Sequence, residues 1–213
     1  MVKYNLNHLQ QEEHQMVCGP IQDDEALFLY SIVKAMRMKR ILEVGGLHGY
    51  SAQNFLASMT EGVLYTVDLN KVPKLSSNHI VIQKDANKVD HLDFAQGDPL
   101  DLVFFDCHNM SQIGLHDRLV KSGIVDSKTI IALHDTNVHY GVNGKPKVHQ
   151  RVERDMTNKL KKLGYDVFCL HPRKKNHGVG TDLKFRHGVS ICQKFKFLPL
   201  TNTACAIGEK FFI

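Results

Sequence analysis

The stretch Arg40 to Ala52, RILEVGGLHGYSA, joins a short apolar run to a helix-like segment through three glycines, Gly45, Gly46 and Gly49. A strand, a glycine turn and a helix in this order bring the backbone close to a ligand beside the helix N-terminus. The spacing is G-G-x-x-G, whereas a dinucleotide site favours G-x-G-x-x-G. The turn alone therefore has two interpretations, a tight connection or a cradle for a nucleotide-like ligand.

Strand-like and helix-like segments alternate along the chain, which predicts an α/β fold with helices on both faces of a doubly wound, mainly parallel sheet. The expected strands, about seven in number, are residues 40–44, 63–68, 80–86, 101–106, 129–135, 165–170 and 187–195. The expected helices are residues 23–38, 51–59 and 148–163, and residues 115–125 are expected to form a helix followed by a turn. The link between the last two strands contains the glycines of Gly178–Thr181, which indicates a hairpin and an antiparallel last strand.

The chain of 213 residues has no repeat or linker, so we expect one domain. Its parts are an N-terminal cap and helix (1–39), a core (40–195) and a tail (196–213) that could pack on the domain or on a second subunit of a homodimer. No apolar run approaches the roughly 20 residues that cross a bilayer, and the polar start lacks a signal sequence. Scattered cysteines without metal-binding spacing are typical of reduced thiols, so we expect a cytoplasmic protein with no membrane partner.

Five acidic residues lie at or near the ends of successive expected strands. They are Glu43, Asp68, Asp85, Asp106 and Asp135. The carboxyl ends of parallel strands meet at one edge of the sheet, where ligands bind. Any one of these acids alone could be a loop cap, but the pairing of Asp68 with the glycine turn favours a ribose-binding carboxylate about twenty residues after the turn.

The segment ILEVGGLHGYSA resembles motif I of class I S-adenosylmethionine (SAM)-dependent methyltransferases, in the form typical of small-molecule O-methyltransferases. The resemblance extends through GPIQDDEALFLYSIVKAMRMKRILEVG, YTVDLN, IQKDAN, LDLVFFDCHN and IIALHDTN, over roughly residues 19–140. It implies a Rossmann-like fold, a SAM cofactor and transfer of a methyl group to a hydroxyl oxygen of a small polar acceptor. Metal-dependent catechol-type enzymes and sugar- or antibiotic-tailoring enzymes are the relatives it suggests.

For motif I, the resemblance implies that Gly45, Gly46 and Gly49 line the methionine and ribose part of the cofactor. Glu43 would orient the glycine loop or bind the amino group. Ser51 would reach the cofactor carboxylate.

For the other strand ends, the resemblance implies that Asp68 binds the ribose hydroxyls. Asp85 and Ala86 would lie beside the adenine amino group. Asp106 would face the sulfonium and the acceptor. His48 occupies a position where the family often has a small hydroxyl residue, so it receives no role.

Two mechanisms of acceptor activation stay open. Asp106 and Asp135 end neighbouring expected strands and could hold Mg²⁺ or another divalent cation, which would lower the pKa of the acceptor hydroxyl. The metal-dependent relatives have an Asp-Asn pair after the fifth strand, whereas Asn137 here comes one residue late. The alternative is a histidine general base, His134 or His108, because imidazole titrates near neutral pH.

The formal net charge of +5 comes partly from a basic segment within residues 173–181. This segment favours an anionic acceptor, or it is a solvated surface loop. No aromatic residues interleave with it, so nucleic acid is not an expected partner. Two other functions compete with methyl transfer. A nicotinamide-dependent oxidoreductase is disfavoured because it would be expected to carry G-x-G-x-x-G. A non-catalytic cofactor-binding module is disfavoured because it would not need the acids and histidines at one edge of the sheet.

Overall fold

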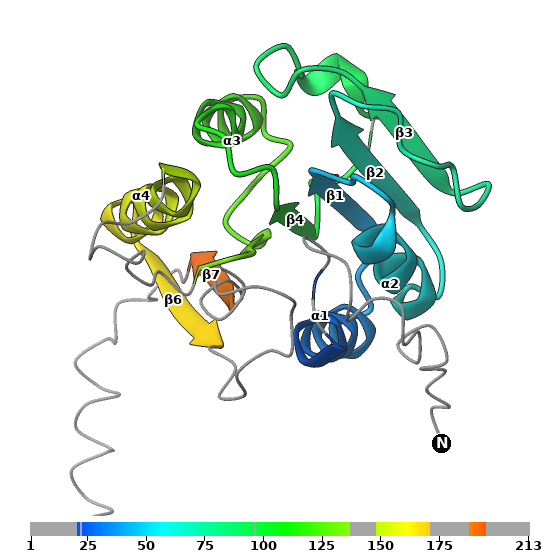
Figure 1. The fold of residues 1–213 in the computed structure, drawn as a ribbon, viewed down its shortest axis with the longest axis horizontal. Coiled ribbons are helices and arrows are strands. Elements are labelled where there is room, and N and C mark those ends of the chain that lie inside the picture. The colour runs from blue at the N-terminus through cyan, green and yellow to red at the C-terminus, as the bar shows by residue number, and fades with distance from the viewer. Residues whose placement is uncertain (1–20, 22, 96, 137–147, 171–187, 195–213) are drawn as a thin grey trace, which may run out of the picture.

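The computed structural model describes residues 21, 23–95, 97–136, 148–170 and 188–194. Seven strands form one sheet in the order β3-β2-β1-β4-β5-β7-β6 (Figure 1). The strands are β1 (Arg40–Val44), β2 (Val63–Asp68), β3 (His79–Gln83), β4 (Leu102–Phe105), β5 (Ile130–Leu133), β6 (Tyr165–Leu170) and β7 (Val189–Lys194). The helices are α1 (Asp23–Met36), α2 (Tyr50–Ser58), α3 (Ser111–Lys121) and α4 (Val148–Lys162), with a short 3-10 helix η3 (His91–Asp93).

The sheet is parallel from β3 to β5, and β7 runs antiparallel to both of its neighbours, β5 and β6. This confirms the predicted mainly parallel sheet with an antiparallel last strand, including the pairing of the last two strands from Leu170 with Val189. From β1 the chain adds β2 and β3 on one side, and it then crosses to add β4 and β5 on the other side. The strand order therefore reverses between β1 and β4. Ligands of such sheets bind at this point, beyond the carboxyl ends of the strands.

Helices cover both faces of the sheet, with α1 and α2 on one face and α3 and α4 on the other (Figure 1). Neighbouring strand residues enter opposite cores, since Phe104 packs with the α1 and α2 side and Phe105 with the α3 and α4 side. All residues of β4 and β5 are buried. Burial on both faces explains why these strands are continuous apolar runs without alternation.

Several element boundaries differ from the sequence-based expectation by one or two residues, and the end of β3 and the start of α3 differ by more. Strand β3 ends at Gln83, because the Asp85 carboxylate accepts the backbone N–H of Asn87 at 2.8 Å and bends the chain into a turn. Asp85 thus lies in the loop beyond the strand. Helix α3 begins earlier than expected, at Ser111, whose N–H donates to the Asn109 side chain at 3.1 Å.

Several predictions concern segments outside the described residues. These are the N-terminal cap up to residue 20, Asn137, the basic segment within 173–181 and the tail 196–213. Among the helices of the described part, none has the length and apolar character required to cross a membrane.

Candidate active site

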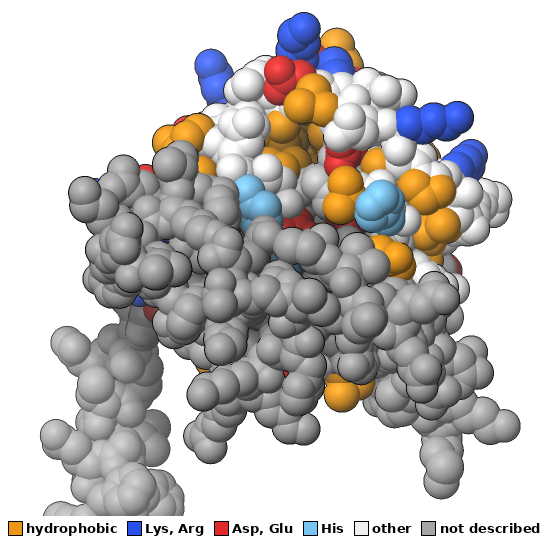
Figure 2. Space-filling model, viewed as in Figure 1, with side chains coloured by type: hydrophobic (Ala, Val, Ile, Leu, Met, Phe, Trp, Pro, Cys, Tyr) orange, Lys and Arg blue, Asp and Glu red, His pale blue; other side chains and the backbone are white. Residues whose placement is uncertain are grey.

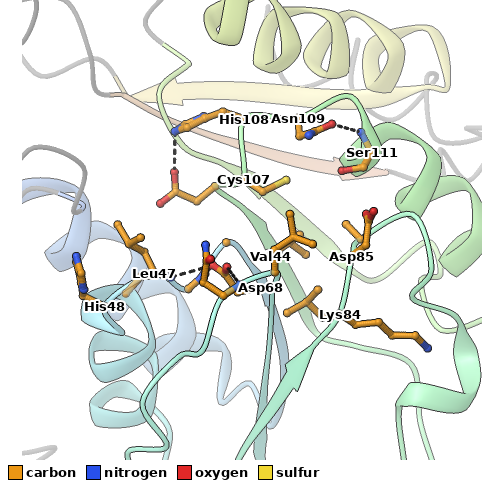
Figure 3. Close-up of a pocket in the computed structure, with 18 of the residues that line it drawn as sticks. Val44, Leu47, His48, Asp68, Lys84, Asp85, Cys107, His108, Asn109 and Ser111 are labelled. Carbon is orange, nitrogen blue, oxygen red and sulfur yellow. Dashed lines mark hydrogen bonds and ion pairs between the residues drawn. The ribbon is translucent and has the colours of Figure 1, made fainter.

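A cavity of about 460 Å³ lies at the carboxyl ends of β1, β2 and β4, where the sheet order reverses (Figure 3). Its wall comes from the loops that follow β1, β2, β3 and β4. The predicted residues that line it are Gly45, Gly46, Ser51, Asp68, Asp85, Ala86, Asp106 and His108, and His48 lines it too. The other predicted residues, Glu43, Gly49, His134 and Asp135, do not form part of its wall.

The glycine turn after β1 is packed too closely for side chains. A Cβ on Gly45 would lie 2.8 Å from the carbonyl carbon and oxygen of Asp106, and its φ is +99°. A Cβ on Gly46 would lie 2.3 Å from the methyl carbon of Thr66. The turn is therefore a tight connection, and it also presents backbone to the cavity, as a cradle for a ligand would.

Asp68 anchors the glycine turn to the end of β2. One of its carboxylate oxygens accepts the backbone N–H groups of Gly46 at 2.9 Å and Leu47 at 3.0 Å. The other oxygen accepts the N–H of Asn70 at 2.8 Å. A carboxylate has about four acceptor positions, so Asp68 keeps capacity for a further donor on the cavity side (Figure 3).

Glu43 lies fully buried beneath the turn. Its carboxylate accepts the hydroxyl of Ser51 and, at 2.7 Å, that of Thr66. The Thr66 oxygen is 2.9 Å from Nε2 of His79, whose Nδ1 accepts the N–H of Leu75, so Nε2 carries the ring proton. Burial raises the pKa of Glu43 to about 7, although the two hydroxyl donors lower it. These contacts favour the loop-orienting role among the two expected for Glu43.

Beside the cavity, six titratable side chains from four parts of the fold meet in what we term the carboxylate–imidazole cluster. Its members are Glu25, Asp106, His108, His134, Asp135 and Glu153. With every carboxyl ionised and both imidazoles protonated, the formal charge of the cluster is still 2−, since it has four acids and two bases. Buried charge of this kind is costly unless it is balanced, so the cluster suits a cationic ligand.

His134 is held from both sides inside the cluster. Its Nδ1 is 2.7 Å from an oxygen of Asp106, and its Nε2 is 3.1 Å from an oxygen of Glu25. Burial lowers the pKa of His134, but the charges of Asp106, Asp135 and Glu25 outweigh this effect and raise it well above its ordinary value. The ring is buried and outside the cavity wall, so His134 is placed to orient Asp106 rather than to contact a ligand there.

His108 lines the cavity and points toward Asp106 (Figure 3). Its Nε2 is 3.3 Å from Asp106 and 3.4 Å from Asp135, and its Nδ1 is 2.9 Å from Glu153. Burial lowers the pKa of His108, but the hydrogen bond to Glu153 and the charges of Asp106 and Asp135 raise it overall. Of the two candidate histidines, His108 is the one that reaches the cavity.

Two residues of this cluster have strained backbones. His108 has a φ of +51° and Asp135 a φ of +52°, a region that residues other than glycine seldom adopt. Such conformations cost on the order of 1–3 kcal/mol each and occur often at functional sites. Both residues meet at Nε2 of His108, which lies 3.3 Å from Asp106 and 3.4 Å from Asp135, so the strained conformations occur where the cluster converges.

On the face seen in Figure 2, some acidic atoms are visible in a recess of the described surface, histidine side chains lie on either side of it, and Lys and Arg side chains lie along the outer edge. The neighbouring Cys107 lines the cavity, and burial raises the pKa of its thiol to about 11. Cys107 therefore stays a neutral thiol at neutral pH and is a poor nucleophile.

Sequence reasoning missed two members of the cluster and part of the cavity wall. Glu25 belongs to an acidic run that suits a helix N-terminus, and Glu153 belongs to an amphipathic helix where a charged residue is normally solvated. Neither position carries a sequence signal of burial. The cavity-lining residues that were missed include Ile21, Leu69, Asn70, Asn87, Asn109 and Ser111.

The sequence matches the family profile described as O-methyltransferase over residues 4–166, which is most of the chain. The fold is similar to that of a SAH-bound methyltransferase from Podospora anserina, at 16% identity and TM-score 0.62, over 92% of this chain and 89% of the other.

Two further structures are similar. The O-methyltransferase TomG from Streptomyces achromogenes, solved in complex with SAM, has 16% identity and TM-score 0.63, with 92% of each chain covered. An O-methyltransferase from Bacillus cereus, in complex with SAH, has 15% identity and TM-score 0.61, with 92% of each chain covered. The family match favours methyl transfer over the nicotinamide-dependent alternative. The chain belongs to the O-methyltransferase family.

Proposed function

We propose that the protein transfers a methyl group from SAM to a hydroxyl oxygen of a small polar molecule, with the cofactor in the cavity and the carboxylate–imidazole cluster beside the acceptor. The observation that carries this proposal is the placement of the glycine turn, Asp68 and Asp106 around one cavity at the reversal point of the sheet. The sulfonium of SAM is a cation, and acidic walls favour it electrostatically. The structures of TomG and the Podospora anserina methyltransferase, which hold SAM and SAH, have the same fold.

The cofactor would be bound by side chains and backbone already in the cavity wall. Asp68 has acceptor capacity for a ribose hydroxyl in addition to the backbone groups it holds. Asp85 and Ala86 lie on the β3 side of the cavity, where the adenine is expected. Gly45 and Gly46 keep the wall open to the methionine part, and Ser51 holds Glu43 beneath them.

We further propose that Asp106 and Asp135 hold a divalent cation. The residues fit such an ion, because the cluster has an excess of two negative charges, and Oε2 of the buried Glu153 has no hydrogen-bond partner among the described residues. Carboxylate oxygens are suitable ligands for hard cations. When bound, the ion would lower the pKa of an acceptor hydroxyl and fix its position.

The methyl transfer itself needs positioning and loss of one proton. The acceptor oxygen attacks the methyl carbon, the carbon–sulfur bond breaks, and the sulfonium becomes a neutral thioether. Asp106 lines the cavity and would face both reacting groups, while His134 holds its carboxylate in one orientation. Alignment of two reactants in this manner supplies much of the rate enhancement in such displacements.

A histidine remains the alternative means of activating the acceptor. Among His108 and His134, only His108 lines the cavity and could take the hydroxyl proton directly. His134 is buried between Asp106 and Glu25 and would act through Asp106. Full activity in the presence of excess EDTA would favour the histidine over the cation.

The test is calorimetric titration of the full chain with SAH, and with NAD as the control ligand. We expect SAH to bind and NAD not to bind. Methyl transfer from isotope-labelled SAM is then measured on a panel of catechols, sugars and acidic metabolites. Failure of SAH to bind to the wild-type protein would remove the cofactor assignment, and binding without transfer to any acceptor would favour a non-catalytic module.

Variants at Asp68 sharpen this test. Asp68→Ala removes a charged acceptor for the ribose and also two hydrogen bonds that hold the glycine turn. We expect SAH binding to weaken by about 2 kcal/mol or more. Asp90→Ala is the control, since Asp90 caps η3 outside the cavity wall and should leave SAH affinity unchanged.

The chemical nature of the acceptor, the oligomeric state and the location of the protein remain proposals. We retain the prediction of an acceptor that is polar or anionic, based on the basic segment within residues 173–181. One domain, a homodimer through the apolar tail and a cytoplasmic location also stay predictions from the sequence.

A further inference from the structure

We infer that His108 is a nitrogen ligand of the cation proposed between Asp106 and Asp135, so that this site prefers ions such as Zn²⁺ or Ni²⁺ over Mg²⁺. The inference rests on the proposed function, because it concerns the same cation. It departs from an all-oxygen site of aspartate and asparagine ligands. Three contacts of the His108 ring support this assignment.

The first two contacts place the imidazole nitrogen beside one oxygen of each carboxylate. Nε2 of His108 is 3.3 Å from Oδ1 of Asp106 and 3.4 Å from Oδ2 of Asp135. Ligand atoms that share one small cation at bond lengths near 2.1 Å are about 3 Å apart. Nε2 of His108 thus has, with each carboxylate oxygen, the spacing of neighbouring ligands around a single ion.

The third contact fixes the tautomer of the ring. Nδ1 of His108 is 2.9 Å from Oε1 of Glu153, a fully buried carboxylate on α4. When Nδ1–H donates to this carboxylate, Nε2 of the neutral ring presents its electron pair toward Asp106 and Asp135. Histidines that bind metals usually donate their other ring N–H to a carboxylate in this way.

His134 differs from His108 in its position, although one of its ring nitrogens belongs with Asp106 and His108 to a group of potential donor atoms that lie within 4.8 Å of one another. Both of its ring nitrogens contact carboxylates, Nδ1 with Asp106 and Nε2 with Glu25. Its ring is also buried outside the cavity wall, whereas His108 lines the cavity, so we assign His134 the role of orienting Asp106. The distinction between the two histidines gives the inference a specific test.

A nitrogen ligand changes which ions are favoured. Carboxylates and water suit Mg²⁺ and Ca²⁺, whereas imidazole suits Zn²⁺, Ni²⁺ and Fe²⁺. A site of two carboxylates and one imidazole should gain affinity for the second group and little for Mg²⁺. Removal of the imidazole should therefore change the two affinities unequally.

The experiment uses Mn²⁺ as a paramagnetic probe on the full-length protein, and it measures nitrogen coupling by electron spin echo envelope modulation. We expect imidazole nitrogen coupling in the wild-type protein and in His91→Asn, an exposed histidine outside the site. The coupling should vanish in His108→Asn. Bound Mn²⁺ without nitrogen coupling would overturn the inference but would still support the proposed cation site. Coupling that persists in His108→Asn would also overturn the inference and would indicate that another histidine is the ligand.

Calorimetry of Zn²⁺ and Mg²⁺ binding tests the consequence. In His108→Asn we expect Zn²⁺ affinity to fall about tenfold or more and Mg²⁺ affinity to change about threefold at most. Glu153→Gln should weaken Zn²⁺ binding about 10- to 100-fold through loss of ring orientation. Equal losses for both ions would overturn the inference.

Two controls separate this result from the proposed function. If the wild-type protein binds none of these ions, the cation is absent and both ideas about it fail. SAH calorimetry on the wild type and on Glu153→Gln, whose side chain lies outside the cavity wall, reports the cofactor site and the fold.

Discussion

At the residue scale, Thr66 has two separate functions at the floor of the glycine turn. Its hydroxyl donates to Glu43 at 2.7 Å and lies 2.9 Å from His79. Its methyl group occupies the space that a side chain at Gly46 would need. A single β-branched residue thus keeps a buried carboxylate hydrogen-bonded and requires glycine at the neighbouring position.

This packing predicts a rescue. Gly46→Ala would place Cβ 2.3 Å from the Thr66 methyl carbon and should destabilise the protein by about 1–3 kcal/mol. Thr66→Ser removes that methyl and keeps the hydroxyl. In urea denaturation, the double variant should be more stable than the sum of the two single changes predicts. Strict additivity would show that the methyl contact does not restrict residue 46.

Glu43 gives a pH prediction at the same scale. Its pKa of about 7 in the folded state exceeds its ordinary value of 4.5, mainly because of burial. Below pH 4.5 the group is protonated in both states and costs nothing. Between pH 4.5 and pH 7 the unfolded state loses this proton while the folded state keeps it, so the stability contributed by Glu43 falls by about 3 kcal/mol, and above pH 7 no more is lost because the folded group ionises too.

The measurement compares the wild type with Glu43→Gln, which is neutral at every pH. The free energy of unfolding of the wild type minus that of the variant should decrease between pH 4.5 and pH 7.5. The difference cancels the titration of the carboxylate–imidazole cluster. A difference that does not depend on pH would contradict the raised pKa.

At the element scale, Asp101 links the starts of β1 and β4. One of its oxygens accepts the backbone N–H groups of Lys39 at 2.7 Å and Arg40 at 2.9 Å. Its own N–H donates to the carbonyl of Arg40 at 2.8 Å. The pair β1 and β4 flanks the reversal point of the sheet, so this contact fixes the two strands whose far ends form the cavity.

Asp101→Ala should leave two backbone donors without their acceptor and lower the free energy of unfolding by about 1–3 kcal/mol. Asp98→Ala, at an exposed position in the same loop, should have little effect. Chemical denaturation of both variants decides the matter. A loss for Asp98→Ala as large as that for Asp101→Ala would indicate a general charge effect rather than this contact.

At the scale of the whole molecule, Glu25 connects the first and last described elements. Its carboxylate accepts the N–H of Gly188, directly before β7, at 2.5 Å and contacts His134 at 3.1 Å. Helix α1 is thereby fixed to the end of β5 and the start of β7. The same residue completes the cluster beside the cavity, so the fold and the site share this group.

Glu25→Ala should therefore destabilise the protein by about 3–5 kcal/mol, because it leaves a buried His134 without one of its partners. Glu61→Ala, which removes an exposed carboxylate paired with Lys39, should cause little change. Thermal and urea unfolding would show the contrast. A small loss for Glu25→Ala would mean that Asp106 and Asp135 alone hold His134.

The sequence by itself determined the fold class, because strand β4 (LVFF) and the glycine turn are local patterns with few alternative structures. It also placed Asp68 and Asp106 at the cavity, since every parallel strand ends at the same edge. Only the tertiary structure showed that Glu43 lies beneath the turn. That placement depends on partners from distant elements, Thr66 on β2 and Ser51 on α2.

The carboxylate–imidazole cluster likewise depends on partners from distant elements, which the sequence alone did not reveal. Asp106, Asp135 and the two histidines were identifiable from strand ends, whereas Glu25 and Glu153 read as solvated helix residues. Helix periodicity indicates which face is apolar, but it cannot show that one glutamate on that helix turns inward to a histidine 45 or 109 positions away. Burial of a charge is decided by the partner that compensates it, and that partner exists only after α1, α4 and the sheet have packed together.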